Sequence, residues 1–370
     1  MRRAPLRLLT TVLCCCAPLF AAANQALADD PNVDALVSKG INFLRTSQAE
    51  DGSFSSQTGP AVTALIATAL MRSGRTPEDP MVAKAMKYLE GFKQEDGGFY
   101  AKDSHYKNYE TALVVLCLGE ANKDGKYDDV LKKADAYLKG IQWDEGEDQD
   151  PSDVDYGGAG YGKHGRPDLS NTSFLVDALK ATGNGPEDEA MKKALAFVSR
   201  CQNLESEYNT TPAAAKNQDG GFYYTPHNGG ESPAGETQDG GLRSYGSISY
   251  AGLKSMIFAG LTKEDPRVQA AVKWIQNNYT TDSNPGMGES GLYYYYHSFA
   301  KALSALGEDE IVDKDGEKHN WRKDLVAALA KRQQENGSWV NKSTRWMEGD
   351  PNLVTGYALL ALSYCGPESK

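Results

Sequence analysis

Residues 43–54 read FLRTSQAEDGSF. This motif consists of the end of an expected helix, a Gln, an Asp-Gly pair and an aromatic residue, and it recurs along the chain. It returns as YLEGFKQEDGGF over residues 88–99 and as QENGSW over residues 334–339. Degenerate copies with longer inserts occupy residues 137–161, 197–222 and 274–293. Asp-Gly and Asn-Gly tolerate positive φ, so each copy predicts a sharp turn after a helix. Repetition of this kind is typical of repeat folds.

A second, apolar helix is expected after each turn. Examples are AVTALIATALM from Ala61 and ETALVVLCLG from Glu110, and a helix that is apolar all round is buried. The helices before the turns, such as residues 34–48 and 324–334, are amphipathic. The apolar helices are expected to begin near Thr63, Thr111, Thr172, Ser249, Tyr296 and Thr355. Six buried helices ringed by six amphipathic ones predict an all-α fold, an (α/α)6 toroid of six helix pairs with Gly-rich loops.

The N-terminal segment has the composition of a secretory signal, with arginines before an apolar run that ends in Ala-Leu-Ala. We therefore expect residues 1–28 to be a signal peptide for export to the periplasm or beyond, and residues 29–370 to form a single toroid domain. Loss of the three arginines takes the formal net charge from −11 to −14, which disfavours a nucleic-acid partner. The three remaining cysteines are too few for a disulfide scaffold.

The Gln … Gly-aromatic turns resemble the QW motifs of squalene and oxidosqualene cyclases, and the helix-pair count is similar to that of protein prenyltransferase β subunits. The resemblance implies an isoprenoid ligand and, for an enzyme, prenyltransferase or terpene cyclase chemistry. Class II cyclases protonate an alkene with the middle acid of an Asp-x-Asp-Asp-Thr segment. Residues 168–172 match this segment, with Asp168 kept and Ser170 and Asn171 in the other two carboxylate positions. A serine cannot supply the strong acid that this protonation needs.

The zinc ligands of the prenyltransferases are replaced as well. The resemblance puts their Asp-x-Cys pair at Ser247 and Ser249, and their histidine at His297 in the stretch Tyr296-His297-Ser298. One imidazole and two hydroxyls do not make a zinc site, because zinc prefers thiolate, imidazole and carboxylate ligands. We therefore expect no metal and no other cofactor.

Several polar residues are predicted at the starts of the inner helices, at the mouth to which the inserts 144–166 and 203–244 contribute. The catalytic candidates are His297, Asp168 and Tyr245. The ligand-binding candidates are Arg243, Glu110, Ser249, Tyr296 and Asp350. A histidine with carboxylates, tyrosine and arginine can support acid-base chemistry or bind a polar ligand. The alternative is that the acidic residues cap helices and that His297 is a hydrogen-bonded structural residue.

Three functional hypotheses follow from the sequence. The first is a terpenoid cyclase or prenyltransferase-like protein that binds an isoprenoid or another apolar ligand in the toroid cavity. The second is a carbohydrate-active toroid, a lyase or hydrolase, whose structural mark would be a pair of carboxylates across a pocket. The third is a non-catalytic scaffold whose ring binds another envelope protein.

Overall fold

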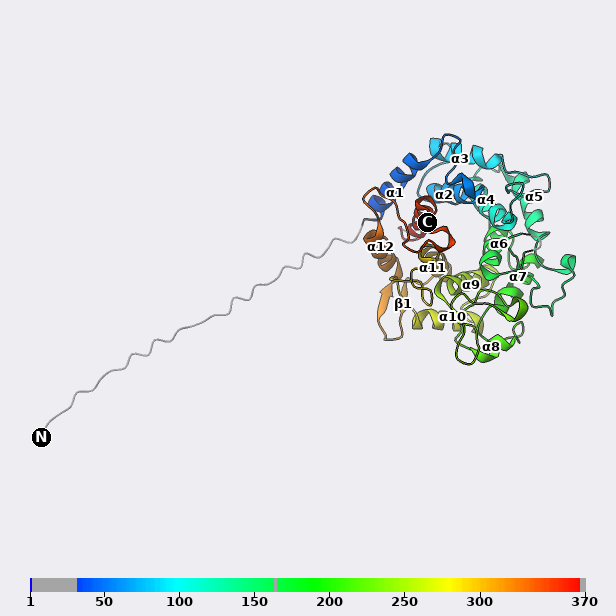
Figure 1. The fold of residues 1–370 in the computed structure, drawn as a ribbon, viewed down its shortest axis with the longest axis vertical. Coiled ribbons are helices and arrows are strands. Elements are labelled where there is room, and N and C mark those ends of the chain that lie inside the picture. The colour runs from blue at the N-terminus through cyan, green and yellow to red at the C-terminus, as the bar shows by residue number, and fades with distance from the viewer. Residues whose placement is uncertain (2–31, 163–164, 367–370) are drawn as a thin grey trace. The chain divides into compact units, whose positions relative to one another are not determined.

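The computed structural model describes Met1, residues 32–162 and residues 165–366, so the signal peptide expected over residues 1–28 lies outside the described residues apart from Met1. In the described part, twelve helices of eleven or more residues form six pairs (Figure 1). The outer members are α1 (Val33–Ser47), α3 (Pro80–Glu90), α5 (Asp128–Lys139), α7 (Glu189–Arg200), α10 (Pro266–Asn277) and α12 (Trp321–Arg332). The inner members are α2 (Ala61–Arg72), α4 (Lys107–Ala121), α6 (Leu169–Ala181), α9 (Gly246–Phe258), α11 (Leu292–Leu306) and α13 (Pro351–Leu362). This arrangement is the predicted α/α toroid.

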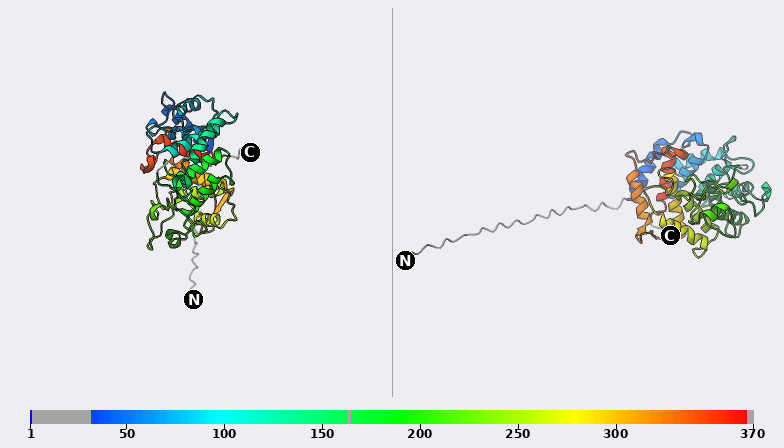
Figure 2. Two further views of the ribbon diagram at one scale, coloured as in Figure 1. Left: turned by 90° about the vertical axis from the view of Figure 1, so that its right-hand side faces the viewer. Right: turned by 60° about the horizontal axis from the view of Figure 1, so that its bottom comes forward.

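The inner helices form a closed ring. Each contacts the next in chain order, and α13 contacts α2, so the last repeat packs against the first. Apart from these pairs, the described residues include the short helix α8 (Pro212–Lys216) and one hairpin, in which β1 (Glu310–Val312) pairs antiparallel with β2 (Lys318–Asn320). The hairpin lies at the periphery beside α12 (Figures 1 and 2). Every described helix is too short or too polar to span a lipid bilayer.

A buried hydroxyl in each of five inner helices fixes the turn that precedes it. The oxygen of Thr63 accepts a hydrogen bond from the backbone N–H of Phe54 at 2.9 Å, and that of Ser249 accepts one from Phe222 at 3.0 Å. The same bond joins Thr111 to Phe99, Thr172 to Ala159, and Thr355 to Trp339. The inner helices therefore begin two to four residues before the predicted positions. These hydroxyls lie in the first turns and bind the preceding loop instead of opening the helix.

A glutamine at the end of an outer helix ties four repeats to their neighbours. The side-chain amide of Gln48 donates to the carbonyl of Gly52 in its own turn and to that of Met81 at the start of α3. Gln142 and Gln202 each make the corresponding pair, one bond to a glycine carbonyl of their own turn and one to the next outer helix. Gln333 reaches Leu36 of α1 at 3.0 Å and so closes the ring. The sequence pattern had pointed to the adjacent Gln334.

The turn glycines are required for two reasons. Gly157 has φ +84°, and a Cβ built on it would lie 1.8 Å from the carbonyl oxygen of Lys193 in α7. Gly337 has φ +89°, and its Cβ would lie 2.4 Å from the carbonyl oxygen of Lys39 in α1. A side chain would therefore strain the backbone and also push the neighbouring outer helix away.

We predict that Gly157→Ala lowers the free energy of unfolding by about 3 kcal/mol or more, because it adds a clash with α7 to the left-handed strain. Gly183→Ala is the matched control, since Gly183 has φ +93° with no atom within 4 Å of its Cβ position. The control should lose only about 1 kcal/mol, the strain alone. Urea unfolding measures both variants, and equal losses would contradict the role assigned to the close contact.

Candidate functional site

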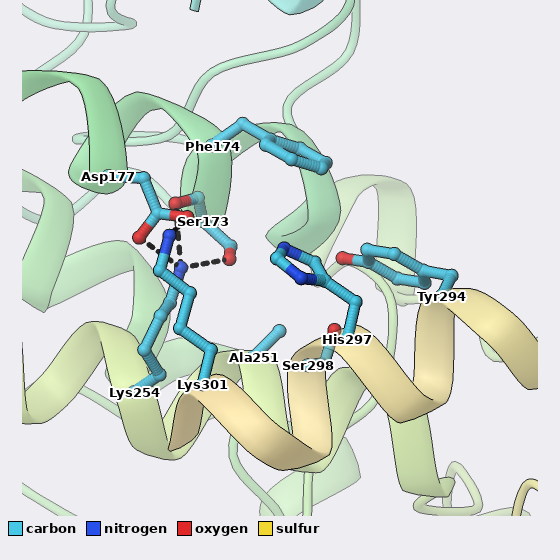
Figure 3. Close-up of a pocket in the computed structure, with 9 residues that line it drawn as sticks. All are labelled: Ser173, Phe174, Asp177, Ala251, Lys254, Tyr294, His297, Ser298 and Lys301. Carbon is cyan, nitrogen blue, oxygen red and sulfur yellow. Dashed lines mark hydrogen bonds and ion pairs between the residues drawn. The ribbon is translucent and has the colours of Figure 1, made fainter. Parts of the chain in front are cut away.

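A small cavity lies inside the ring, between α6, α9 and α11 (Figure 3). It has a volume of about 10 Å³, which is room for about one water molecule. Its lining residues are Ser173, Phe174, Asp177, Ala251, Lys254, Tyr294, His297, Ser298 and Lys301. These residues come from three consecutive inner helices and include a carboxylate, two ammonium groups and an imidazole.

A buried ion cluster forms one side of the cavity. Asp177 on α6 accepts from Lys254 Nζ on α9 at 2.7 Å and from Lys301 Nζ on α11 at 2.6 Å. Asp177, Lys254 and Lys301 are only 4%, 3% and 9% exposed. Burial acts to raise the pKa of Asp177, but the two lysines hold it at about 2, so the carboxylate is ionised. Burial lowers the pKa of Lys254 to about 8.

His297 lies one turn before Lys301 on α11 and faces the same cavity (Figure 3). It is buried, and its Nδ1 has no hydrogen-bond partner among the described residues. Burial and then the charge of Lys301 hold its pKa well below 6.5, so the imidazole is neutral at physiological pH. A neutral imidazole offers one donor and one acceptor, so His297 can bind a polar group but is not charged.

Four aromatic rings from four inner helices meet above the ion cluster. Tyr109 packs edge-on against Phe174 at 5.1 Å, and Phe174 stacks on Tyr294 at 6.1 Å. Tyr294 contacts Tyr357 at 6.0 Å, and the hydroxyls of Tyr357 and Tyr109 lie 3.4 Å apart. We call these four residues the aromatic layer. It lies in the first two turns of the inner helices, between the mouth and the ion cluster.

Asp168 lies at the mouth, where it is the N-cap of α6. It is 1% exposed, and its carboxylate accepts from the backbone N–H of Asn171 at 2.9 Å and from the Asn171 amide at 2.7 Å. Burial raises the pKa of Asp168 to about 6. Ser170, in the position of the expected acid, has its hydroxyl 3.2 Å from that of Tyr294. Tyr245, the N-cap of α9, is buried nearby, within electrostatic range of Asp168.

The five candidate ligand-binding residues are spread around the mouth, and each anchors local structure. Glu110 accepts from the N–H of Ala101 and the hydroxyl of Ser104. Arg243, Tyr296 and Ser249 bind backbone groups of Glu236, Thr281 and Phe222, respectively, and Asp350 is the N-cap of α13. His297 is the predicted residue that faces the lumen cavity. A direct role in catalysis or ligand binding for these eight residues stays a prediction.

A second depression, an open groove, lies at the mouth where the last repeat meets the first. Its lining residues are Ser55, Gln57, Thr344, Met347, Gly349, Asp350, Pro351 and Asn352. The loop beside it is held by Glu348, which is 1% exposed and accepts from the backbone N–H groups of Tyr293 and Tyr294. Trp346 and Met347 are held at φ +54° and +64° with their side chains 46% and 44% exposed. Such strain in two consecutive residues is common at ligand sites.

Three side chains of the peripheral hairpin, Asp313, Glu317 and His319, have potential metal ligand atoms within 4.8 Å of one another. Both nitrogens of His319 are already paired, with Asp313 at 3.1 Å and with Asp324 at 3.2 Å. The prenyltransferase-like zinc positions do not form a ligand set, because the Ser249 hydroxyl is bonded to Phe222 and Ser247 is bonded to Asn284.

Sequence reasoning missed the ion cluster. Asp177, Lys254 and Lys301 each interrupt an apolar inner helix, in the stretches LVDAL, GLKSM and FAKAL. A lone charge in a helix that is buried all round needs a partner, because lysine and aspartate are almost never buried unpaired. This signal is readable in the sequence, although the pairing of the three residues is not.

Comparisons with known proteins support this fold. Residues 57–228, less than half of the chain, match the family model of the squalene-hopene cyclase C-terminal domain. A variant of the type II terpene cyclase MstE from Scytonema is 11% identical, with TM-score 0.51 over 90% of this chain and 96% of that chain. The GH76A α-1,6-mannanase from Salegentibacter sp. HEL1_6 is 11% identical, with TM-score 0.58 over 90% and 98%.

A family 88 glycosyl hydrolase from Bacteroides vulgatus is also 11% identical, with TM-score 0.53 over 90% of this chain and 98% of that chain. At these identities the similarity shows the fold alone. No curated protein matches the chain in sequence.

Asp168 gives a pH-dependent prediction. Its folded pKa of about 6 lies above the ordinary 3.8, so between these values the folded chain binds more protons than the unfolded chain and stability falls as pH rises. The stability of the wild type relative to Asp168→Asn should therefore drop by about 2 kcal/mol between pH 4 and 7. Urea unfolding at each pH measures this difference.

Asp188, the N-cap of α7, is the matched control. Partial burial acts to raise its pKa, but Lys139 lowers it overall, so Asp188 contributes stability that is lost as pH falls below about 4. The comparison of the wild type with Asp188→Asn should have the opposite slope. If the stability difference changed with pH in the same direction for Asp168→Asn and for Asp188→Asn, the raised pKa assigned to Asp168 would be contradicted.

Proposed function

Since the chain has the α/α toroid of the squalene cyclase and prenyltransferase superfamily, we propose that it binds an isoprenoid or a similar apolar ligand in the lumen. The observation that carries the proposal is the aromatic layer, placed above a polar cavity inside a ring of apolar helices. Aromatic and aliphatic walls with a few convergent polar groups are the usual composition of a small-molecule site.

The lumen needs a local rearrangement to admit such a ligand. Its volume of about 10 Å³ is far below the range of about 300–1,000 Å³ that is typical of ligand pockets. Tyr109 and Tyr294 are only half-buried, unlike the other two rings of the aromatic layer. Rotation of these two side chains toward the mouth would join the cavity to the space above it.

The proposed activity is binding, without alkene protonation. Ser170 stands where the superfamily resemblance implies the acid, and its hydroxyl contacts Tyr294. Asp168 is the remaining carboxyl group of the segment, and both of its oxygens accept hydrogen bonds from Asn171. Neither arrangement supplies a strong, free acid directed at an alkene.

We predict that Phe174→Trp weakens binding of farnesol by about tenfold or more, because the larger ring overfills the aromatic layer. Isothermal titration calorimetry measures the affinity of the mature protein. Phe92→Trp is the control, because Phe92 pairs with Tyr88 in the outer layer, outside the lumen. Equal affinities for the two variants, or no farnesol binding by the wild type, would refute the lumen site.

The groove at the mouth supports glycan binding as a second candidate function. Asp350 Oδ2 and Asn352 Oδ1 are buried and have no partner among the described residues, so a small side-chain rotation would be needed to present these acceptors to the hydroxyl donors of a sugar. Trp346 precedes the groove residue Met347 in the chain and is 46% exposed, and the Arg345 guanidinium lies 4.3 Å from its ring centroid, so a sugar would stack on the part of the ring that Arg345 leaves uncovered. Asp350 is the one carboxylate among the described residues that line the groove, so the observation favours binding over hydrolysis, which uses a pair.

Trp346→Ala should reduce retention on immobilised manno-oligosaccharides by about tenfold, as expected for loss of one stacked aromatic ring at a binding hot spot. Affinity chromatography on the immobilised sugar measures this loss. Tyr208→Ala is the control, since Tyr208 is an exposed aromatic residue on the loop between α7 and α8, which contributes no residue to the groove. Unchanged retention of the Trp346 variant, or absence of retention for the wild type, would eliminate the glycan candidate.

A further inference from the structure

We infer that the cavity formed by Asp177, Lys254, Lys301 and His297 is an anion-binding site. The anion is either a small free ion or the charged end group of a ligand whose apolar part lies in the aromatic layer. For the second source the inference rests on the proposed function and deepens it, because it assigns the lumen ligand a phosphate or carboxylate end.

The buried charges do not balance. Asp177 contributes one negative charge, while Lys254 and Lys301 contribute two positive charges within hydrogen-bonding distance of it. Two other cations on the inner helices do not change this balance. Arg72 on α2 is paired with Glu120 on α4 at 3.1 Å, and Lys180 on α6 is exposed to solvent. An uncompensated charge in a buried site is costly unless it is paired, so the cluster is one anion short.

The unused hydrogen-bond donors point to the same conclusion. Lys254 Nζ uses all three of its protons, on Asp177, on the Ser173 carbonyl at 3.0 Å and on the Ser173 hydroxyl at 2.7 Å. Lys301 Nζ has a single acceptor among the described residues, Asp177. The ring of Phe258, 5.9 Å from Lys301 Nζ, gives a weak cation–π contact but no hydrogen-bond acceptor. Two N–H groups of a buried ammonium are therefore left without an acceptor among the described residues, and an anion in the cavity would accept from them.

The opposite wall of the cavity completes the site. His297 Nδ1 has no hydrogen-bond partner among the described residues. In the neutral tautomer that carries its proton on Nδ1, the ring would donate a further hydrogen bond to the same anion. In Figure 3 the ring projects from α11 into the cavity, toward the side where Ser173 and Phe174 lie. Ammonium, imidazole and hydroxyl groups from three helices converge here, which a simple structural ion pair would not need.

The test compares two anion sources on the mature protein. The first arm measures the thermal unfolding midpoint while bromide replaces gluconate at constant ionic strength. The second arm compares the affinities of farnesyl monophosphate and farnesol by isothermal titration calorimetry. We expect saturable stabilisation by bromide, or about tenfold tighter binding of the phosphate, the effect of one charge-assisted hydrogen bond. Bromide stabilisation identifies a free ion as occupant, and phosphate preference identifies a ligand-borne group.

Lys301→Met should abolish either effect, and it leaves Asp177 and Lys254 as a neutral pair that is expected to fold. Lys301→Arg keeps the charge and should restore the effect in part, and Lys180→Met is the control for loss of an exposed charge. A wild type that shows neither effect overturns the inference, as does an effect that survives Lys301→Met. Farnesol binding without any phosphate preference or bromide effect would refute the anion site and leave the proposed function standing. Bromide stabilisation without farnesol binding would support the anion site and refute the proposed function.

Discussion

The toroid depends on a set of hydrogen bonds between backbone groups of the turns and side chains of the helices. A hydroxyl in the first turn of an inner helix holds the preceding turn, as Thr63 holds Phe54. A glutamine at the end of an outer helix holds the start of the next one, as Gln48 holds Met81. These bonds satisfy buried backbone groups that the chain reversal would otherwise leave unpaired. Because they link successive repeats, they fix the spacing of the pairs as well as the shape of each turn.

The closed ring brings the inner helices to a common lumen, and this explains why its few polar residues cluster. A buried charge away from the ends of an inner helix cannot reach solvent past the neighbouring helices, so it needs a partner on an adjacent inner helix. Asp177 finds Lys254 and Lys301 in this way. The aromatic layer has the same origin, since Tyr109, Phe174 and Tyr294 come from three different helices and meet because the helices converge.

The six helix pairs could be predicted from the sequence because each pair is encoded locally. A Gly-containing turn marks each pair, and the helix before the turn is amphipathic whereas the helix after it is apolar. It misplaced the helix starts because a threonine that caps a helix and one that binds the preceding turn are alike in sequence. The ion cluster was missed because the meeting of Asp177 and Lys301 depends on the rotation of helices 124 residues apart in the chain. The left-handed backbone of Trp346 was not foreseen either, since non-glycine residues rarely adopt positive φ.

The bond from Gln333 to Leu36 joins the two ends of the repeat array, and α13 packs against α1 and α2. An open solenoid needs terminal capping repeats to shield its exposed ends, whereas this ring uses its first repeat to cover its last. Each repeat has two neighbours, so loss of any one would expose two interfaces at once and the array should unfold as a single cooperative unit. The same adjacency makes the starting point of the toroid arbitrary: a circular permutant that joins the ends near α1 and α13 and opens at another surface turn would keep every interface of the ring.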